Sequence, residues 1–588
     1  MTYRAPINDI LLALNHGAGL QAAARAGHLG DYDPDIAAAV LEEAGKFASD
    51  VLAPLNRVGD QNGIKLTDGK VTTAPGWPDA YQRWTAAGWN AVAGREDFGG
   101  QGLPGAINAA CTEIWSAANI AFELCPLLTA SAIEALDAHG SDELKNIYLA
   151  KLISGEWPGT MQLTEPHAGS DVGLLRSRAE RAADGTYRIS GTKIFITYGD
   201  HDMTDNIIHF VLARLPDAPA GTKGISLFLI PKYLVNADGS LGKRNDIYPS
   251  GVEHKLGIHA SPTCTMTMGD NGGAVGYLIG EENRGMQCMF TMMNQARLGV
   301  GLQGVGIAER ATQQAMQYAR ERRQGRAAGM DAAQSVAIVA HADVRRMLLT
   351  MRALTDAARA ICYATAVALD CSERAGDAAA RAAALDRTAL LTPLAKAFAT
   401  DVAVEVASLG VQVHGGMGFI EEAGAAQLYR DARIMPIYEG TNGIQAIDLV
   451  TRKLPLAGGA AVKAFIGELR AVATAVAAAN DPAFGATAAR LGETLDHLDR
   501  ATAWLTARLD GAPEAALAGA TPYLRLFGIA AGGSLLARDA LAALRNGGAD
   551  SRVALARFFA DHIATAAGGL ATTVTEGGAS VESAALMG

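Results

Sequence analysis

The chain has 588 residues, a formal net charge of -11 and 49% hydrophobic residues, enough for several domains or one large core with additions. The acidic balance, without a long basic run, argues against nucleic acid as an obligate partner. The cysteines lack a CxxC pair, which suits a reducing compartment and predicts no metal site. They are Cys111, Cys125, Cys264, Cys288, Cys362 and Cys371.

Neither the N-terminal region nor any apolar run predicts a membrane protein. Residues 1–20 place Asp9 and His16 within an apolar stretch and lack a charged leader with a small-residue cleavage site, so they do not resemble a signal peptide. The longest apolar run, 526–537, is too short to cross roughly 30 Å of hydrocarbon. We expect a cytoplasmic protein without membrane insertion.

The first half of the chain changes texture near residue 158. Residues 1–157 show helical spacing, as in 36–44 behind Asp35, a candidate helix cap. Residues 158–282 instead carry short β-branched and aromatic runs. A hairpin is predicted with its turn at Asp184-Gly185, and strands are predicted at 193–197, 207–212 and 225–230. Because no long helices separate them, we expect an antiparallel barrel or sandwich.

Helical texture returns after the β region. Residues 283–453 contain Ala-rich stretches, 308–322 and 336–370, that predict a helical bundle. Residues 454–588 form a further helical block without a repeat of fixed period. The predicted fold class is α+β with four domains: 1–157 helical, 158–282 an antiparallel β-barrel, 283–453 a helical bundle and 454–588 an additional helical domain.

Three familiar motifs fail on their context. Gly299 to Gly304 fits GxGxxG, but no strand precedes it, so close helix packing is favoured. His414-Gly415-Gly416-Met417-Gly418 resembles the oxyanion loop of lipases, yet the chain contains no GxSxG. It also contains no GxxxxGK[ST]. Serine hydrolase and P-loop readings are therefore excluded.

The stretch 435–445 places a single carboxylate, Glu439, in a Gly-rich turn. Pro436 interrupts what precedes it, and Thr441 or Asn442 can cap a new helix where apolar spacing resumes. A loop between two helices is expected. From this segment alone two interpretations stay open: a catalytic carboxylate, or a solvated one that favours the positive end of the helix.

Four separated segments carry a family resemblance. Thr164-Glu165-Pro166-His167-Ala168-Gly169-Ser170-Asp171 resembles the TEPxAGSD signature of the acyl-CoA dehydrogenases, and Tyr438-Glu439-Gly440-Thr441 matches their YEGT segment. Residues 415–419 and 429–434 match two more family segments. The resemblance covers residues 35 to 450 and implies the domain order above, bound FAD and an acyl-CoA substrate.

The resemblance implies that Glu439 is the base that takes the α-proton of an acyl-CoA thioester. The β-hydrogen would leave as hydride to flavin N5, giving a trans-2-enoyl-CoA. Hydrogen bonds to the thioester oxygen, from the flavin ribityl hydroxyl and the backbone amide of the base, would stabilise the developing enolate. Burial beside the acyl chain would raise the pKa of Glu439 toward the working pH.

The resemblance also implies the ligand contacts. Arg322 would bind the FAD pyrophosphate of a neighbouring subunit, which implies a homo-oligomer. The alternative interpretation stays open that the basic residues around Arg322 form a solvated face of a helix. Asn294 replaces a family acid, and Gln324 replaces the usual Phe before Gly325. The implied FAD contacts are Leu163, Thr164, Gly169, Ser170, Phe195, Thr197, Arg322, Gln324, Gln412, Gly416 and Thr441. The implied substrate contacts are Ser170, Asn294, Arg297 and Gly440.

Within the family, the chain looks most like bacterial members that oxidise 3-methylmercaptopropionyl-CoA, with methylthioacryloyl-CoA as product. An electron-transferring flavoprotein is the expected acceptor. Residues 454–588 resemble an extension that takes the place of a second dimer in tetrameric members, so a homodimer is favoured. The alternatives are a medium- or long-chain fatty acyl-CoA dehydrogenase, an acyl-CoA oxidase that passes electrons to oxygen, and a catalytically silent scaffold.

Overall fold

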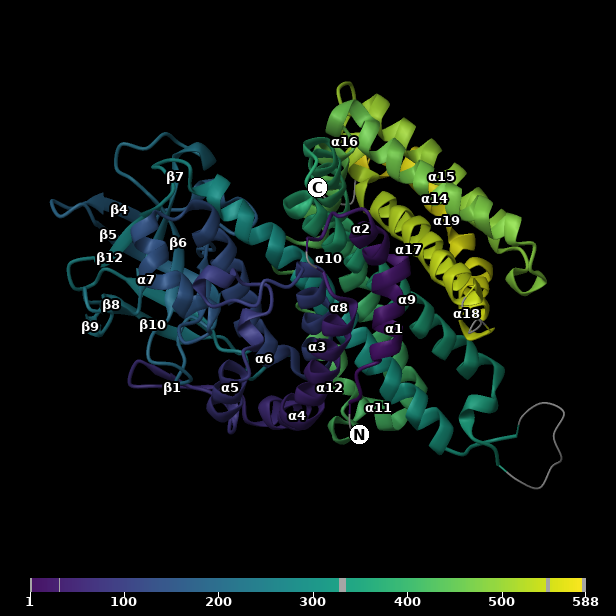
Figure 1. The fold of residues 1–588 in the computed structure, drawn as a ribbon, viewed down its shortest axis with the longest axis horizontal. Coiled ribbons are helices and arrows are strands. Elements are labelled where there is room, and N and C mark those ends of the chain that lie inside the picture. The colour runs from purple at the N-terminus through teal and green to yellow at the C-terminus, as the bar shows by residue number, and fades with distance from the viewer. Residues whose placement is uncertain (1–2, 31, 327–334, 546–549, 584–588) are drawn as a thin grey trace.

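The structure is a computed structural model that describes residues 3–30, 32–326, 335–545 and 550–583. Figure 1 shows the β strands at one side of the molecule, the long helices α8, α9 and α10 in the middle and the C-terminal helices at the other side. This arrangement confirms the α+β class. The four domain limits remain predictions.

The N-terminal region is helical, with one long core helix, α6. Asp33 caps α3 through the backbone N–H groups of Asp35 and Ile36, so the expectation of Asp35 as cap was wrong. The reason is that Pro34 occupies the first helical position. The elements are α1 Ile7–Leu12, α2 Leu20–Arg25, α3 Pro34–Phe47, α4 Ala53–Asn62, β1 Lys65–Thr67, β2 Lys70–Thr72, α5 Trp77–Ala86, α6 Gly105–His139 and α7 Asp142–Ile153.

The middle region is a β-barrel. Its strands pair in a closed ring, β5-β12-β7-β6-β4 and back to β5, while β11 and β10 extend from β5 and β3 adds to β6. The strands are β3 Gly159–Gln162, β4 Arg178–Arg181, β5 Tyr187–Thr197, β6 Ile208–Arg214, β7 Ile225–Pro231, β8 Tyr233–Val235, β9 Leu241–Arg244, β10 Ile247–Val252, β11 Thr263–Met268 and β12 Ala274–Ile279.

The sequence predicted an antiparallel barrel, and this was wrong for two pairs of strands. β3 and β4 each pair parallel with β6. Parallel pairing needs a long crossover, and the segment from Gln162 to Ile208 provides one that contains only a short 3-10 helix, Val172–Leu174. The hairpin across Asp184-Gly185 is confirmed, because β4 pairs antiparallel with β5 around it.

A bundle of three long helices follows the barrel. The expected helix 336–370 begins later, at Ala342, because Ile338 N–H bonds the carbonyl of Arg322 at 2.8 Å and residues 338–340 form a short 3-10 turn. The helices are α8 Gly285–Glu321, α9 Ala342–Arg374, α10 Ala378–His414, α11 Gly416–Phe419, α12 Ala425–Ala432 and α13 Asn442–Asp448.

The C-terminal helices pack on this bundle. Arg552 of α18 pairs with Asp9 near the N-terminus and with Asp356 of α9, so the last helices are tied to both. Among the described residues, two helices, α6 and α17, are long and apolar enough to cross a membrane, but 94% and 89% of their apolar windows are buried in the fold. The helices are α14 Ala460–Ala479, α15 Thr487–Arg508, α16 Pro513–Ala518, α17 Ala520–Arg545, α18 Asp550–His562, α19 Ala567–Glu576 and α20 Gly578–Glu582.

Candidate active site

The Glu439 turn, residues 436–442, lies between α12 and α13 as predicted. Asn442 N–H bonds the carbonyl of Pro436 at 3.0 Å and closes the turn. Thr441 is the N-cap of α13, and its hydroxyl accepts a hydrogen bond from Ile444 N–H at 3.3 Å. The turn is therefore fixed at both of its ends.

Glu439 has an unusual backbone conformation, and opposing effects act on the pKa of its carboxyl. Its φ is +57°, in the left-handed region that non-glycine residues rarely adopt, and Gly440 follows at +86°. The side chain is only partly exposed at the surface, yet it lies among enough protein atoms for burial to raise the pKa of the carboxyl. The positive charges of Arg297 and Lys396 oppose this rise.

Arg297 and Asn294, both predicted substrate contacts, differ in exposure. Asn294 is exposed on α8, whereas Arg297 is buried beside Glu439, and its Nε has no hydrogen-bond partner among the described residues. Burial lowers the pKa of Arg297, and the charges of Asp448 and Glu439 counteract this. Arg297 thus offers a desolvated guanidinium next to the carboxylate.

A buried polar chain supports the residue before the base. The Tyr438 hydroxyl donates to Gln303 of α8, and the Gln303 amide donates to Glu123 of α6 at 2.8 Å. Burial raises the pKa of Glu123 to about 8, so this carboxyl is largely protonated at neutral pH. Three elements of the fold therefore meet at Tyr438.

The signature loop, residues 163–171, leaves β3 and turns back beside β5. Lys193 of β5 donates to the Leu163 carbonyl at 3.0 Å and to the Glu165 carboxylate at 2.8 Å, and both side chains are buried. Ile194 N–H bonds the carbonyl of Thr164 at 3.0 Å. These bonds fix the start of the loop. Thr164 is partly exposed, and Gly169 and Ser170, further along the loop, are exposed to solvent.

Phe195 and Thr197 lie on β5, directly after the residues that hold this loop. Phe195 has a left-handed φ of +59° and a side chain that is 59% exposed. A large aromatic residue on a strained backbone, turned out of the core, is a feature that needs another partner to explain it. Thr197 pairs with Thr263 of β11 and is partly exposed.

Four other predicted cofactor residues, Arg322, Gln324, Gln412 and Gly416, gather at the far end of the bundle. Arg322 ends α8, and its N–H bonds the carbonyl of Tyr318, whose ring stacks on His414 at 4.4 Å between centroids. All four are exposed. Arg322 lies roughly 37 Å along α8 from Arg297, at 1.5 Å per residue.

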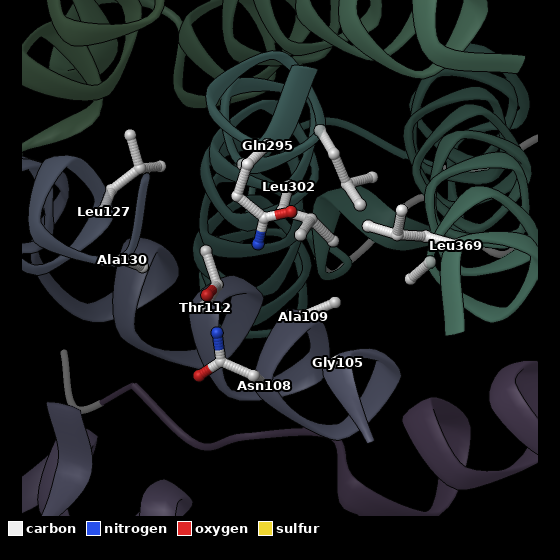
Figure 2. A pocket seen from close by; sticks show the side chains of 12 residues that line it. Gly105, Asn108, Ala109, Thr112, Leu127, Ala130, Gln295, Leu302 and Leu369 are labelled. Atoms are coloured by element: carbon white, nitrogen blue, oxygen red, sulfur yellow. The ribbon is translucent and has the colours of Figure 1, made fainter. Parts of the chain in front are cut away.

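The cavity in Figure 2 is separate from the base. It measures about 40 Å³ and lies between α6, α8 and α9, where Gln295 reaches down from α8 toward Thr112 and Asn108. Leu298 and Leu302, which also line it, lie about 100° and about 140° around α8 from Arg297. This volume holds only a few water molecules, too little for an acyl chain.

Sequence comparison decides the family. Residues 35–156, 160–270 and 283–454 match the sequence families described as "Acyl-CoA dehydrogenase, N-terminal domain", "middle domain" and "C-terminal domain". The chain belongs to the acyl-CoA dehydrogenase family. Residues 462–584 match "Acetyl-CoA dehydrogenase C-terminal like". As a member of this family, the protein is an FAD-dependent oxidoreductase with acyl-CoA dehydrogenase activity.

Three relatives illustrate the range of similarity. The 3-methylmercaptopropionyl-CoA dehydrogenase of Ruegeria pomeroyi is 46% identical over 600 aligned positions, covering 100% of both chains. A butyryl-CoA dehydrogenase of Syntrophomonas wolfei is 38% identical and covers 77% of this chain and 75% of its own. An acyl-CoA dehydrogenase from Bacillus anthracis, solved with FAD, shares the fold with a TM-score of 0.75 at 21% identity, over 92% of this chain and 88% of that one.

The predicted contacts of this acyl-CoA dehydrogenase suit FAD in chemistry and exposure. Phe195 offers an exposed ring for a flat heterocycle, the Thr164 and Ser170 hydroxyls can bond to it or its phosphates, and Arg322 offers a guanidinium to an anion. Arg322 lies roughly 37 Å along α8 from Arg297, whose charge acts on Glu439, so the Arg322 group and the Glu439 turn are well separated within a single chain.

Several residues that hold the acyl-CoA dehydrogenase site were not predicted to contact it. Lys396, Asn442, Gln303 and Glu123 support the Glu439 turn, and Lys193 supports the signature loop. One signal was present: Lys396 is a lone lysine in the apolar stretch 390–399 of a helix, where a charge needs a buried partner.

Proposed function

We propose that the protein oxidises 3-methylmercaptopropionyl-CoA to methylthioacryloyl-CoA, with Glu439 as the base that takes the α-proton. The proposed role of Glu439 as the base rests on one observation: its carboxylate is desolvated, lies on a strained turn and is flanked by the positive charges of Arg297 and Lys396. The full-length similarity to the Ruegeria pomeroyi enzyme supports this substrate.

The chain's own groups supply the proton chemistry. Burial moves the pKa of Glu439 upward, toward a value at which the carboxylate both ionises near neutral pH and accepts a proton from a weak carbon acid. The Glu439 N–H can donate to the thioester oxygen, where charge develops as the α-proton leaves. FAD held by the residues named above supplies the acceptor for the β-hydride.

The separation of the two groups of predicted cofactor residues supports assembly of at least two copies. Gln412 and Gly416 are flanked by exposed apolar side chains, Met417, Phe419 and Ile420, and Phe419 is 86% exposed. A second copy that covers this surface would bring Arg322 of one chain to the flavin held by the other. We propose a cytoplasmic homodimer that passes electrons to an electron-transferring flavoprotein.

A straight-chain acyl-CoA is the second candidate substrate. It is favoured by the 38% identity to a butyryl-CoA dehydrogenase over three quarters of the chain. An acyl-CoA oxidase would use the same base but reduce oxygen.

A substrate panel separates these candidates. The flavin-loaded enzyme is assayed with 3-methylmercaptopropionyl-CoA and with straight acyl-CoA thioesters of increasing length, using an artificial electron acceptor. We expect the highest kcat/KM for the methylthio substrate. A higher value for a straight-chain thioester contradicts the substrate, and rapid peroxide formation without the acceptor contradicts the dehydrogenase.

A further inference from the structure

Lys396 of α10 is completely buried, and it donates hydrogen bonds to the Glu439 turn. Its Nζ lies 2.8 Å from the carbonyl oxygen of Gly440 and 2.8 Å from the Oδ1 of Asn442. Both acceptors are neutral. In the described part of the chain, no ion pair joins Lys396 to a carboxylate, so its charge is not neutralised by direct contact.

Asn442 completes the connection between the turn and α10. Its amide Nδ2 donates to the Ala397 carbonyl at 3.2 Å, to the Thr400 hydroxyl at 2.9 Å and to the Asp401 carboxylate at 2.7 Å. We call Lys396, Thr400, Asp401 and Asn442 the turn clamp. It joins successive positions of one helix to the two sides of Thr441.

The turn needs such a clamp because its backbone is strained. A non-glycine residue held at positive φ costs about 1–3 kcal/mol and persists only where the surrounding contacts over-determine it. Glu439 is held in that way between two fixed points. Tyr438 is bonded to Gln303 on one side, and the carbonyl of Gly440 is bonded to Lys396 on the other.

The charges around Lys396 include the proposed base. Burial lowers the pKa of Lys396 to about 7, with Arg297 of α8 acting in the same direction and Glu439 of the turn and Asp401 of α10 opposing it. Conversely, Arg297 and Lys396 are the two cations that oppose the burial-driven rise in the pKa of Glu439. The lysine and the carboxylate therefore each favour the charged form of the other.

We propose that Lys396 is the positioning residue of the base: it holds the Glu439 turn in its left-handed conformation through Gly440 and Asn442, and its ammonium favours the carboxylate form of Glu439. The proposal rests on the proposed role of Glu439. It assigns two separable duties to one side chain, a hydrogen-bonding duty and a charge duty.

Three variants separate these duties. Lys396→Met removes both of them. Lys396→Gln keeps a neutral amide donor and removes the charge, and Asn442→Ala loosens the clamp and keeps the charge. Lys255→Met is the matched control, because Lys255 is also a lysine with a burial-lowered pKa that donates to a carbonyl, that of Ser261 at 3.0 Å, but it lies in the β region.

Two measurements on the flavin-loaded holoenzyme report the two duties. Hydrogen–deuterium exchange of the peptide containing residues 436–442 reports the clamp. The pH profile of kcat with 3-methylmercaptopropionyl-CoA or butyryl-CoA, whichever turns over faster, reports the ionisation of the base.

Lys396→Met should accelerate exchange of the turn, lower kcat about 10-fold or more with little change in KM, and move the acid limb of kcat upward by at least about one pH unit. Lys396→Gln should move the acid limb of kcat by a similar amount. Hydrogen–deuterium exchange of the turn should be slower in Lys396→Gln than in Lys396→Met. Asn442→Ala should accelerate exchange with a smaller shift of the limb. Lys255→Met should change neither quantity.

An unchanged acid limb in Lys396→Gln overturns the charge duty, and unchanged exchange in both Lys396→Met and Asn442→Ala overturns the clamp. If Lys396→Met does not fold, Lys396→Gln and Asn442→Ala decide. Glu439→Gln is assayed in parallel: full turnover in that variant rejects the proposed base, whereas the exchange data still judge the clamp on their own.

Discussion

Two loops of this acyl-CoA dehydrogenase are each held by a buried lysine, but the lysines have different partners. In the signature loop, Lys193 contacts the Glu165 carboxylate at 2.8 Å, and Glu165 also accepts from Ser177. Burial opposes the charged form of Glu165, but Lys193 and the hydrogen bonds prevail and lower its pKa. At the Glu439 turn, the hydrogen bonds that Lys396 donates to described residues go to neutral oxygens.

The difference indicates what each lysine is for. A lysine paired with a carboxylate is neutralised within the loop that it holds, so Lys193 fixes the loop's geometry and leaves little net charge for its surroundings. No described carboxylate contacts Lys396 directly, and its charge favours the ionised forms of the proposed base, Glu439, and of Asp401. The contrast is between a structural lysine, Lys193, and a proposed positioning lysine, Lys396.

Lys193→Met should cause the larger loss of stability. It leaves Glu165 buried without its counter-charge, and breaking a buried ion pair by removing one partner costs about 3–5 kcal/mol. Lys396→Met strands no directly paired carboxylate and should cost less. Urea unfolding of the holoenzyme, followed by flavin fluorescence, measures both losses.

The double variant Lys193→Met/Glu165→Leu is the control for this prediction. Because it removes both charges, it should recover much of the loss. A double variant as unstable as Lys193→Met would mean that packing, and not the ion pair, is what Lys193 contributes.

Glu439→Gln should reduce kcat by at least about 100-fold, which is the lower end of general-base contributions and corresponds to about 2.7 kcal/mol. The amide is similar in shape, so flavin content should match that of the wild type. Stopped-flow reduction of the flavin by substrate measures the effect. A rate within a few fold of the wild type would remove Glu439 from the chemistry.

Lys396 should also make stability depend on pH. Its pKa is about 7 in the folded protein and about 10.4 in an unfolded chain. Between these pH values Lys396 is protonated in the unfolded chain and neutral in the folded protein. The contribution of Lys396 to the free energy of unfolding therefore rises by about 1.4 kcal/mol for each unit of increasing pH, and it is constant below pH 7.

Urea titrations of wild type and Lys396→Met across that range measure this contribution. The wild type should show the steeper rise with pH, and equal slopes would show that Lys396 keeps its ordinary pKa. Lys255→Met again controls for the loss of a partly buried lysine, because the pKa of Lys255, about 8, predicts a narrower window.

The sequence predicted the parts of this site that depend on local pattern. The turn around Glu439, a helix cap at Thr441 or Asn442 and the hairpin at Asp184-Gly185 follow from Pro, Gly and capping residues, whose effects reach only a few positions along the chain; the structure selects Thr441 as the cap. The family resemblance supplied the roles of residues such as Glu439 and Arg322, which remain predictions.

What the sequence could not predict depends on contacts between distant segments. The parallel pairing of β3 with β6 joins strands far apart in the chain, and the bond from Lys396 to Gly440 joins two different elements of the bundle. The left-handed φ of Glu439 is likewise invisible in local pattern, since only tertiary contacts hold a glutamate there.

The smallest effect should come from the cap behind the base. Thr441→Ala removes the hydroxyl that accepts from Ile444 N–H at 3.3 Å, and Ser141→Ala removes the matching bond from Leu144 N–H, also at 3.3 Å, at the start of α7. Each should cost about 1 kcal/mol of stability, the usual value of an N-cap. Only Thr441→Ala should also lower kcat, because α13 begins directly behind Glu439 and a frayed first turn loosens one anchor of the strained backbone. Equal kcat values in the two variants would show that the turn clamp holds the base without help from the cap.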